Sequence, residues 1–319
     1  MSLDRRSLLR SLATAGAAAV AVEGTAQARV RPMAPADALG LLYDTSLCIG
    51  CKACVVACRE ANGTKPETSN SPGGIWDAPM DLDGQTKTVI KLYKSPDGIQ
   101  RSYFKAQCMH CVDPACTNAC MLGALKKKEH GIVSYDPSLC VGCRYCQMAC
   151  PFNVPKFEWA KAAPKIVKCE LCRERAKGQP AVDGSGFTRY PKGQGPACAE
   201  VCPRSAVIAG TRAELLAEAR RRIASHPGRY KGFREDDPPK IFGETDGGGT
   251  QVLYLSHVAF EKLRLPNLSD QPVPEVQQTI QHGIYQGFAA PILLYGLLGA
   301  AVFRNRRAAG EKPEKGGES

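Results

Sequence analysis

One uninterrupted run constrains this chain more than any other feature. It extends from Cys140 to Pro151 and reads Cys-Val-Gly-Cys-Arg-Tyr-Cys-Gln-Met-Ala-Cys-Pro. The spacing C-x2-C-x2-C-x3-C-P is a ligand run that holds cubane 4Fe-4S clusters. Three of its sulfurs can reach one cluster, whereas the fourth cysteine serves a neighbouring cluster in proteins that hold two. The run therefore predicts a partner run elsewhere in the sequence.

All sixteen cysteines of the 319 residues fall into four quartets. The first repeats the spacing above, the second has two more residues before its third cysteine, and a long Gly- and Pro-rich insertion splits the fourth. In sequence order the quartets are Cys48, Cys51, Cys54 and Cys58; Cys108, Cys111, Cys116 and Cys120; Cys140, Cys143, Cys146 and Cys150; and Cys169, Cys172, Cys198 and Cys202.

Two other uses of paired cysteines compete with this interpretation. Disulfide frameworks are typical of small secreted domains that lack a core, whereas this protein is long enough to build one. Four-cysteine zinc sites also use C-x2-C pairs. They do not explain four trailing C-x3-C units, two of which are followed by proline. The sequence therefore predicts iron–sulfur clusters.

The N-terminus has the features of an export signal. Arg5 and Arg6 precede a weakly apolar, alanine-rich run from Leu12 to Val22, and an Ala-x-Ala site ends at Ala28. We interpret residues 1–28 as a twin-arginine signal peptide outside the fold, since the run is too short and too weakly apolar for an anchor helix. This pathway exports folded proteins, so clusters inserted in the cytoplasm can enter an oxidising compartment.

The C-terminus has the features of a membrane anchor. Residues 284–303 are twenty consecutive uncharged, mostly apolar residues, enough for about 30 Å of helix. We predict a transmembrane helix at 280–304 rather than a buried core helix, because arginines follow it at once. By the positive-inside rule, the tail 305–319 is cytoplasmic and the preceding domain at 29–279 faces the periplasm. Gln281, His282 and Tyr285, at the outer end of this helix, are candidates for an electron exit, although an ordinary interfacial histidine is the simpler interpretation of His282.

Short strands and turns alternate between the quartets. We predict strands at 40–44 and 207–209 and hairpins at 86–104 and 124–135, with an insertion loop at 59–84. Thr211 and Glu214 form a capping box for a helix that Pro227 ends. Its run Arg220–Arg222 fits a solvated face better than a binding patch, and Gly247–Gly249 fits a turn better than a nucleotide loop.

The net charge of +11 does not indicate nucleic-acid binding. No recognition helix or stacking-aromatic motif is visible, and part of the excess lies in the predicted signal and tail. The remaining positive charge can offset the negative charge of thiolate-ligated clusters. The sequence also has no zinc-protease motif, dinucleotide fingerprint or recognisable catalytic triad.

The order of the quartets, the insertion within the fourth and the C-terminal anchor resemble the iron–sulfur beta subunits of periplasmic formate dehydrogenase and related molybdopterin oxidoreductases. The signal on this protein itself, with Gly40–Asp44 and Gly249–Leu255, is more similar to the HybA-type iron–sulfur subunits of membrane-bound nickel–iron hydrogenase. This resemblance implies an α+β fold of two pseudo-symmetric dicluster-ferredoxin-like units with insertions, plus one transmembrane helix. One unit would combine residues 48–58 with 169–210, the other would span 108–150, and 211–279 would be an extension.

The resemblance also implies a nested exchange of ligands among four 4Fe-4S clusters, in which the first quartet pairs with the fourth and the second with the third. The implied ligand sets are Cys48, Cys51, Cys54 and Cys202; Cys169, Cys172, Cys198 and Cys58; Cys108, Cys111, Cys116 and Cys150; and Cys140, Cys143, Cys146 and Cys120.

A non-catalytic electron-transfer subunit is the function that we expect. It would connect the small and large subunits of a periplasmic hydrogenase to an integral membrane subunit that reacts with quinone. A formate dehydrogenase or another molybdopterin enzyme is the alternative partner. An enzyme that uses its clusters catalytically would need an open iron site, whereas sixteen cysteines leave no iron open.

Overall fold

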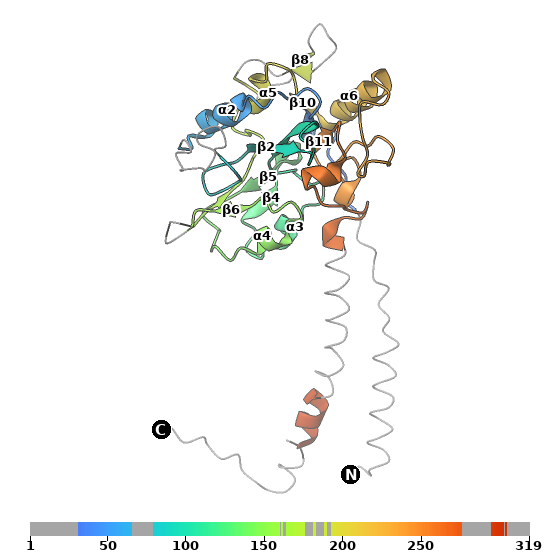
Figure 1. Cartoon of the computed structure of the whole chain (residues 1–319). Coiled ribbons are helices and arrows are strands. Elements are labelled where there is room, and N and C mark those ends of the chain that lie inside the picture. The colour runs from blue at the N-terminus through green and yellow to red at the C-terminus, as the bar shows by residue number, and fades with distance from the viewer. Residues whose placement is uncertain are drawn as a thin grey trace. The chain divides into compact units, whose positions relative to one another are not determined.

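The computed structural model describes residues 31–65, 79–159, 161, 164–175, 181–182, 188–189, 193–275, 295–302 and 304. The predicted signal peptide, Gln281, His282 and Tyr285 lie outside the described residues, as does most of the predicted membrane helix; 295–302 and 304 are helical (Figure 1). Within the described parts of the protein, no helix is both long enough and apolar enough to cross a membrane. The cysteines all belong to the compact unit Arg31–Pro274.

A three-stranded sheet forms the centre of this unit. Strand β1 (Leu39–Asp44) lies between β10 (Val207–Thr211), which is antiparallel to it, and β11 (Val252–Leu255), which is parallel to it. All of β1 and β11 is buried. The strands predicted at 40–44 and 207–209 are confirmed, whereas the pairing of β11 with β1 was not predicted.

The strands join the cysteine quartets in a nested order. β1 enters the first quartet and pairs with β10, which leaves the fourth. In the same way, β4 (Leu125–Lys127) leaves the second quartet and pairs antiparallel with β5 (Val133–Tyr135), which enters the third. The compact domain therefore contains two substructures of the same design. The outer unit is built from the first and fourth quartets, and the inner unit from the second and third.

Short helices repeat this nesting. Helix α2 (Ala53–Asn62) of the first quartet packs on α5 (Ala197–Glu200) of the fourth, and α3 (Ala115–Asn118) of the second packs on α4 (Tyr145–Ala149) of the third. Figure 1 shows the two helix pairs at opposite ends of the unit. The expected mixed α+β architecture is confirmed. The insertion loop predicted from residue 59 begins too early, because α2 continues to Asn62 and ends at Gly63, whose left-handed backbone caps the helix.

The predicted hairpins are also present. Strands β2 (Val89–Lys94) and β3 (Arg101–Ala106) pair antiparallel, and β4 and β5 are joined through the 3-10 turn η2 (Glu129–Gly131). Four two-residue strands also pair antiparallel among the described residues: β6 (Lys156–Phe157) with β7 (Ile166–Val167), and β8 (Ala181–Val182) with β9 (Thr188–Arg189).

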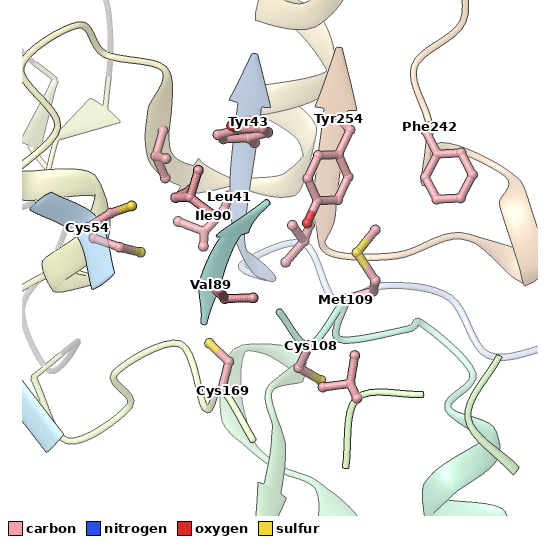
Figure 2. Close-up of a cluster of buried hydrophobic side chains, with 14 of the residues drawn as sticks. Leu41, Tyr43, Cys54, Val89, Ile90, Cys108, Met109, Cys169, Phe242 and Tyr254 are labelled. Atoms are coloured by element: carbon pink, nitrogen blue, oxygen red, sulfur yellow. The ribbon is translucent and has the colours of Figure 1, made fainter. Parts of the chain in front are cut away.

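The largest hydrophobic core contains residues of both the outer and the inner unit. Figure 2 shows Val89 and Ile90 from β2 among Leu41, Tyr43 and Tyr254, with Cys54, Cys108 and Cys169 at its border. The rings of Tyr43 and Tyr254 meet edge to face at 5.6 Å, an arrangement that aromatic pairs favour. Thiols from three quartets therefore border one packed core, which fixes their relative positions.

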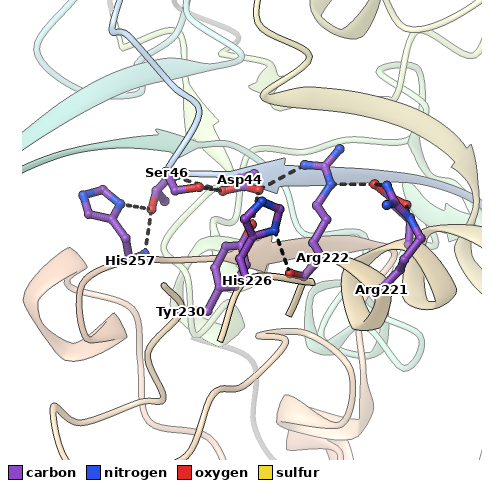
Figure 3. A network of polar contacts seen from close by, with 9 residues as sticks. Asp44, Ser46, Arg221, Arg222, His226, Tyr230 and His257 are labelled. Carbon is purple, nitrogen blue, oxygen red and sulfur yellow. Dashed lines mark hydrogen bonds and ion pairs between the residues drawn. The ribbon is translucent and has the colours of Figure 1, made fainter. Parts of the chain in front are cut away.

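Helix α6 (Arg212–Ser225) packs on the sheet. Its predicted capping box is confirmed, since the Thr211 N–H donates to Glu214 Oε2 and the Glu214 N–H donates to Thr211 Oγ1. The prediction of a solvated basic face is wrong for Arg222. This side chain is only 12% exposed and pairs with the fully buried Asp44, as Figure 3 shows. It also pairs with Glu218.

The segment after α6 is held on the core by short turns. Gly247–Gly249 lies at the 3-10 turn η3 (Asp246–Gly248), as the turn prediction expects. A further turn, η4 (Phe260–Leu263), buries Phe260 beside Phe242, with the ring centroids 5.3 Å apart. The residues that follow β11 thus add apolar side chains to the main core.

Candidate iron–sulfur sites

Each C-x2-C unit makes the same turn. The residue immediately before the second cysteine has a positive φ in all four units: Gly50 at 71°, His110 at 48°, Gly142 at 75° and Leu171 at 50°. This conformation turns backbone N–H groups toward the first cysteine, so that Gly50 donates to Cys48 Sγ and Leu171 donates to Cys169 Sγ, both at 3.4 Å. Non-glycine residues rarely adopt it without a compensating constraint.

Hydrogen bonds from backbone amides to sulfur favour the thiolate over the thiol. Such bonds to cluster ligands are among the factors that set the reduction potential of iron–sulfur proteins. At Cys48 and Cys169, these bonds therefore favour the thiolate form that binds a metal.

The first cysteine group combines the two outer quartets. Cys48, Cys51, Cys54 and Cys202 line one cavity, together with Tyr43 and Ile90 of the core. The first three come from the loop and first turn that open α2, and Cys202 follows α5. The packing of α2 on α5 thus brings together residues that are far apart in the sequence.

The second group uses the remaining cysteines of the same quartets. Cys58, Cys169, Cys172 and Cys198 line a second cavity. The empty space is about 350 Å³ in the first cavity and about 340 Å³ in the second, part of it open to solvent. Cys54 and Cys58 are one turn apart on α2 yet line different cavities. A single helix therefore contributes one thiol to each group.

The inner quartets supply the third and fourth groups. Burial first, and then the nearby Cys150, Cys108 and Cys116, raise the pKa of Cys111 well above its ordinary value. Burial and the nearby Cys120, Cys140 and Cys143 likewise raise the pKa of Cys146 to about 11. These mutual effects identify the thiols that lie together, and each group again takes a member from both quartets.

The donor set fits a cationic metal cluster. All sixteen cysteines belong to the described residues, and each is a free thiol there. Burial raises the pKa of Cys58 to about 12 and that of Cys108 to about 11 even with Lys105 and Lys168 nearby, so these groups are neutral thiols at pH 7 in the absence of a metal. A coordinating metal removes the thiol proton.

No group of three or more His, Cys, Asp or Glu side chains in the described parts of the protein converges on a single-ion position. In a zinc site, four sulfurs surround one ion at about 2.3 Å. A cubane instead gives each thiolate a separate iron, so its ligands stand farther apart.

The four groups form a sequence through the unit. Cys54 and Cys58 connect the first group to the second along α2. Cys169 of the second group lies close enough to Cys108 of the third to raise its pKa, and Cys146 of the fourth does the same to Cys116 of the third. Cys51 and Cys143, in the two terminal groups, are the exposed cysteines.

Exposed apolar side chains lie close in sequence to the cysteines of the fourth group. They are Met121, Leu122, Leu139, Val141, Tyr145 and Met148, of which Val141 is 74% and Met148 is 84% exposed. At the other end, Ile49, Val56 and Val201 are exposed near the first group.

Two buried lysines near the thiols were not predicted. Lys105 lines the same cavity as the second group, and Lys168 counteracts the rise in the pKa of Cys108 and Cys116. Both side chains are buried. Their position shortly before Cys108 and Cys169 was the available signal, but burial of a lysine cannot be inferred from such spacing alone.

Together, the repeated C-x2-C turns and the nested thiol groups define an iron–sulfur protein of the dicluster ferredoxin class. Residues 99–212 match the family model for the 4Fe-4S dicluster domain, and residues 41–60 match that for the 4Fe-4S binding domain. The protein is 38% identical to the hydrogenase-2 operon protein HybA of Escherichia coli O157:H7 and of Shigella flexneri, over 96% of both sequences. It belongs to the family of these HybA proteins.

Other relatives are named as iron–sulfur subunits of formate dehydrogenase. The protein is 33% identical to the nitrate-inducible formate dehydrogenase iron–sulfur subunit of Escherichia coli K12, over 78% of each sequence. The two relationships agree with the resemblance noted from the sequence.

Proposed function

We propose that this protein is the electron-transfer iron–sulfur subunit of a hydrogenase and that it holds four 4Fe-4S clusters. The observation that carries the proposal is the gathering of sixteen thiols into four groups, within a protein related over nearly its whole length to a hydrogenase operon protein. When bound, the clusters supply one-electron transfer at low cost in rearrangement of the protein.

The proposed ligands follow the nested exchange. Cys48, Cys51 and Cys54 act with Cys202, and Cys169, Cys172 and Cys198 act with Cys58. Cys108, Cys111 and Cys116 act with Cys150, and Cys140, Cys143 and Cys146 act with Cys120. The cavities shared by the outer quartets and the mutual pKa effects of the inner thiols support these sets.

The residues of this protein determine the path that an electron takes. Cys51 and Cys143 place the two ends at the surface, while the buried Cys108, Cys169 and Cys198 keep the middle away from water. Exposed apolar side chains beside both ends offer surfaces on which redox partners could dock without intervening solvent. This arrangement suits a subunit that accepts electrons at one face and releases them at another.

The proposed partners are the small and large subunits of a periplasmic nickel–iron hydrogenase and an integral membrane subunit that reacts with quinone. The paired arginines before an alanine-rich run support export, and the arginines after 284–303 support a single anchor with a cytoplasmic tail. The cluster domain would then face the periplasm at the inner membrane.

A formate dehydrogenase is the second candidate partner, because the iron–sulfur subunits of that enzyme are also related to this protein. The hydrogenase is favoured because the HybA relatives match 96% of the sequence, whereas the formate dehydrogenase relatives match about four fifths of it.

Anaerobic purification of the native complex tests the proposal. We expect hydrogenase subunits to co-purify, the clusters to become reduced under hydrogen, and iron analysis to give about sixteen irons per protein molecule, four for each cubane. About eight irons, zinc in their place, or a molybdopterin subunit as the partner would contradict it. Formate added in place of hydrogen distinguishes the two candidate partners.

A further inference from the structure

Lys105 is completely buried beside the second cysteine group. It lies on β3, paired in register with Ile90, and its side chain is 0% exposed. It lines the cavity that also contains Cys58, Cys169, Cys172 and Cys198. A lysine in such a place is unusual, since lysines are almost never fully buried unless their charge is paired.

The hydrogen bonds of the Lys105 ammonium go to neutral groups. Its Nζ donates to Thr88 Oγ1 at 2.5 Å and to Gln107 Oε1. Among the described residues, no carboxylate forms an ion pair with it. Removing a cation from water costs several kcal/mol unless an anion balances it. The two oxygens orient the ammonium but leave its charge uncompensated.

The groups that do bear on this charge are cysteines. The cavity that Lys105 lines is shared by Cys58, Cys169, Cys172 and Cys198. These four form the second group, and as ligands of a cluster they would be thiolates. The negative charge that balances Lys105 therefore comes from the ligand side of the cavity.

We infer that Lys105 is a buried counter-charge that raises the reduction potential of the cluster held by Cys58, Cys169, Cys172 and Cys198. A cubane with four thiolates is negatively charged and gains one further negative charge when it accepts an electron. A fixed cation beside it stabilises the reduced state more than the oxidised state. Lys105 thus favours residence of the electron in the interior of the protein.

Lys87 provides a matched comparison. It lines the same cavity, but its charge is shared with Glu170 at 3.9 Å, and both side chains are partly exposed. Water and the carboxylate both reduce the field that Lys87 exerts on the thiols. Loss of its charge should affect the same cluster less.

The experiment compares Lys105→Met, Lys105→Arg and Lys87→Met in the full-length protein within its complex. Midpoint potentials are measured by redox titration with electron paramagnetic resonance, and the signal of the second group is assigned by its loss in Cys172→Ala. We expect Lys105→Met to lower this potential, Lys105→Arg to keep it near that of the wild type, and Lys87→Met to lower it by less than Lys105→Met does.

An unchanged potential in Lys105→Met, or an equal decrease in Lys87→Met, would overturn the inference. If Lys105→Met loses this one cluster, retention of the cluster in Lys105→Arg supports the counter-charge, and its loss in both variants contradicts it. The inference rests on the proposed function because it requires the cluster. Iron analysis of the wild-type protein separates the two: low iron refutes the clusters and the inference together, whereas about sixteen irons with an unchanged potential in Lys105→Met refutes the inference alone.

Discussion

Replacement of Arg222 by methionine should destabilise the cluster domain far more than the same change at its neighbour Arg221. Arg222 Nη1 lies 3.1 Å from Asp44 Oδ2, and its Nε lies 2.7 Å from Glu218 Oε1. Asp44 is fully buried. Without Arg222, its carboxylate would accept hydrogen bonds only from the hydroxyl of Tyr230 and from the backbone N–H and hydroxyl of Ser46. Removing one member of a buried ion pair costs about 3–5 kcal/mol.

Arg221 is the matched control. It belongs to the same helix and binds the same Glu218, but its side chain is 65% exposed. An exposed ion pair contributes about 0–1 kcal/mol. For a domain of this size, 1 kcal/mol corresponds to about 2–4 °C in melting temperature. We therefore expect a decrease of about 6–20 °C for Arg222→Met and at most about 4 °C for Arg221→Met.

Circular dichroism of the cluster-loaded protein, heated without oxygen at one fixed scan rate, measures this difference. The fixed rate is needed because unfolding with loss of a cofactor is not a reversible two-state process. Adding Asp44→Asn to Arg222→Met should recover part of the loss, since the buried charge is then removed. Equal decreases for the two arginine variants would refute the assignment of Arg222 to a buried pair.

Three further predictions concern the ligands and the two ends of the protein. Cys58→Ala should damage the cluster of the second group rather than its sequence neighbour, and spectroscopic loss of the cluster at Cys48, Cys51 and Cys54 would contradict the exchange. Arg5→Lys with Arg6→Lys should leave the loaded protein in the cytoplasm, as cell fractionation would show, whereas normal export would exclude the twin-arginine pathway. Deletion of 280–319 should release a soluble protein that keeps its iron but no longer supports quinone reduction in membranes; full activity would show that the anchor is dispensable.

The features that the sequence could predict are those that depend on neighbouring residues. The Thr211–Glu214 capping box, the hairpins and the cysteine spacing each involve a few consecutive positions, so their physical causes are visible in the sequence. The repeated quartets likewise indicated the class of metal group. What the spacing did not contain was the partner of each fourth cysteine, which came from the family resemblance alone.

The features that could not be predicted depend on contacts between distant segments. Strand β11 is buried because it pairs with β1, and no local pattern specifies that register. The sequence predicted Arg222 on a solvated face, but it pairs with the buried Asp44. Lys105 lies in a predicted hairpin strand, and nothing in its sequence neighbourhood indicates its complete burial. In each case, burial was decided by the tertiary fold, which overrides local propensity.

Because the quartets are nested, the inner unit of the domain can form earlier than the outer unit. In the inner unit, Leu125 pairs with Tyr135, so its strands can meet soon after they leave the ribosome. In the outer unit, Leu39 must wait for Thr211, and the parallel strand β11 follows later still. Closing the longer loop costs more entropy and proceeds more slowly. Under the proposed exchange, Cys48, Cys51 and Cys54 would wait for Cys202 until most of the protein has been synthesised, so the inner unit would be ready to receive its clusters before the outer one.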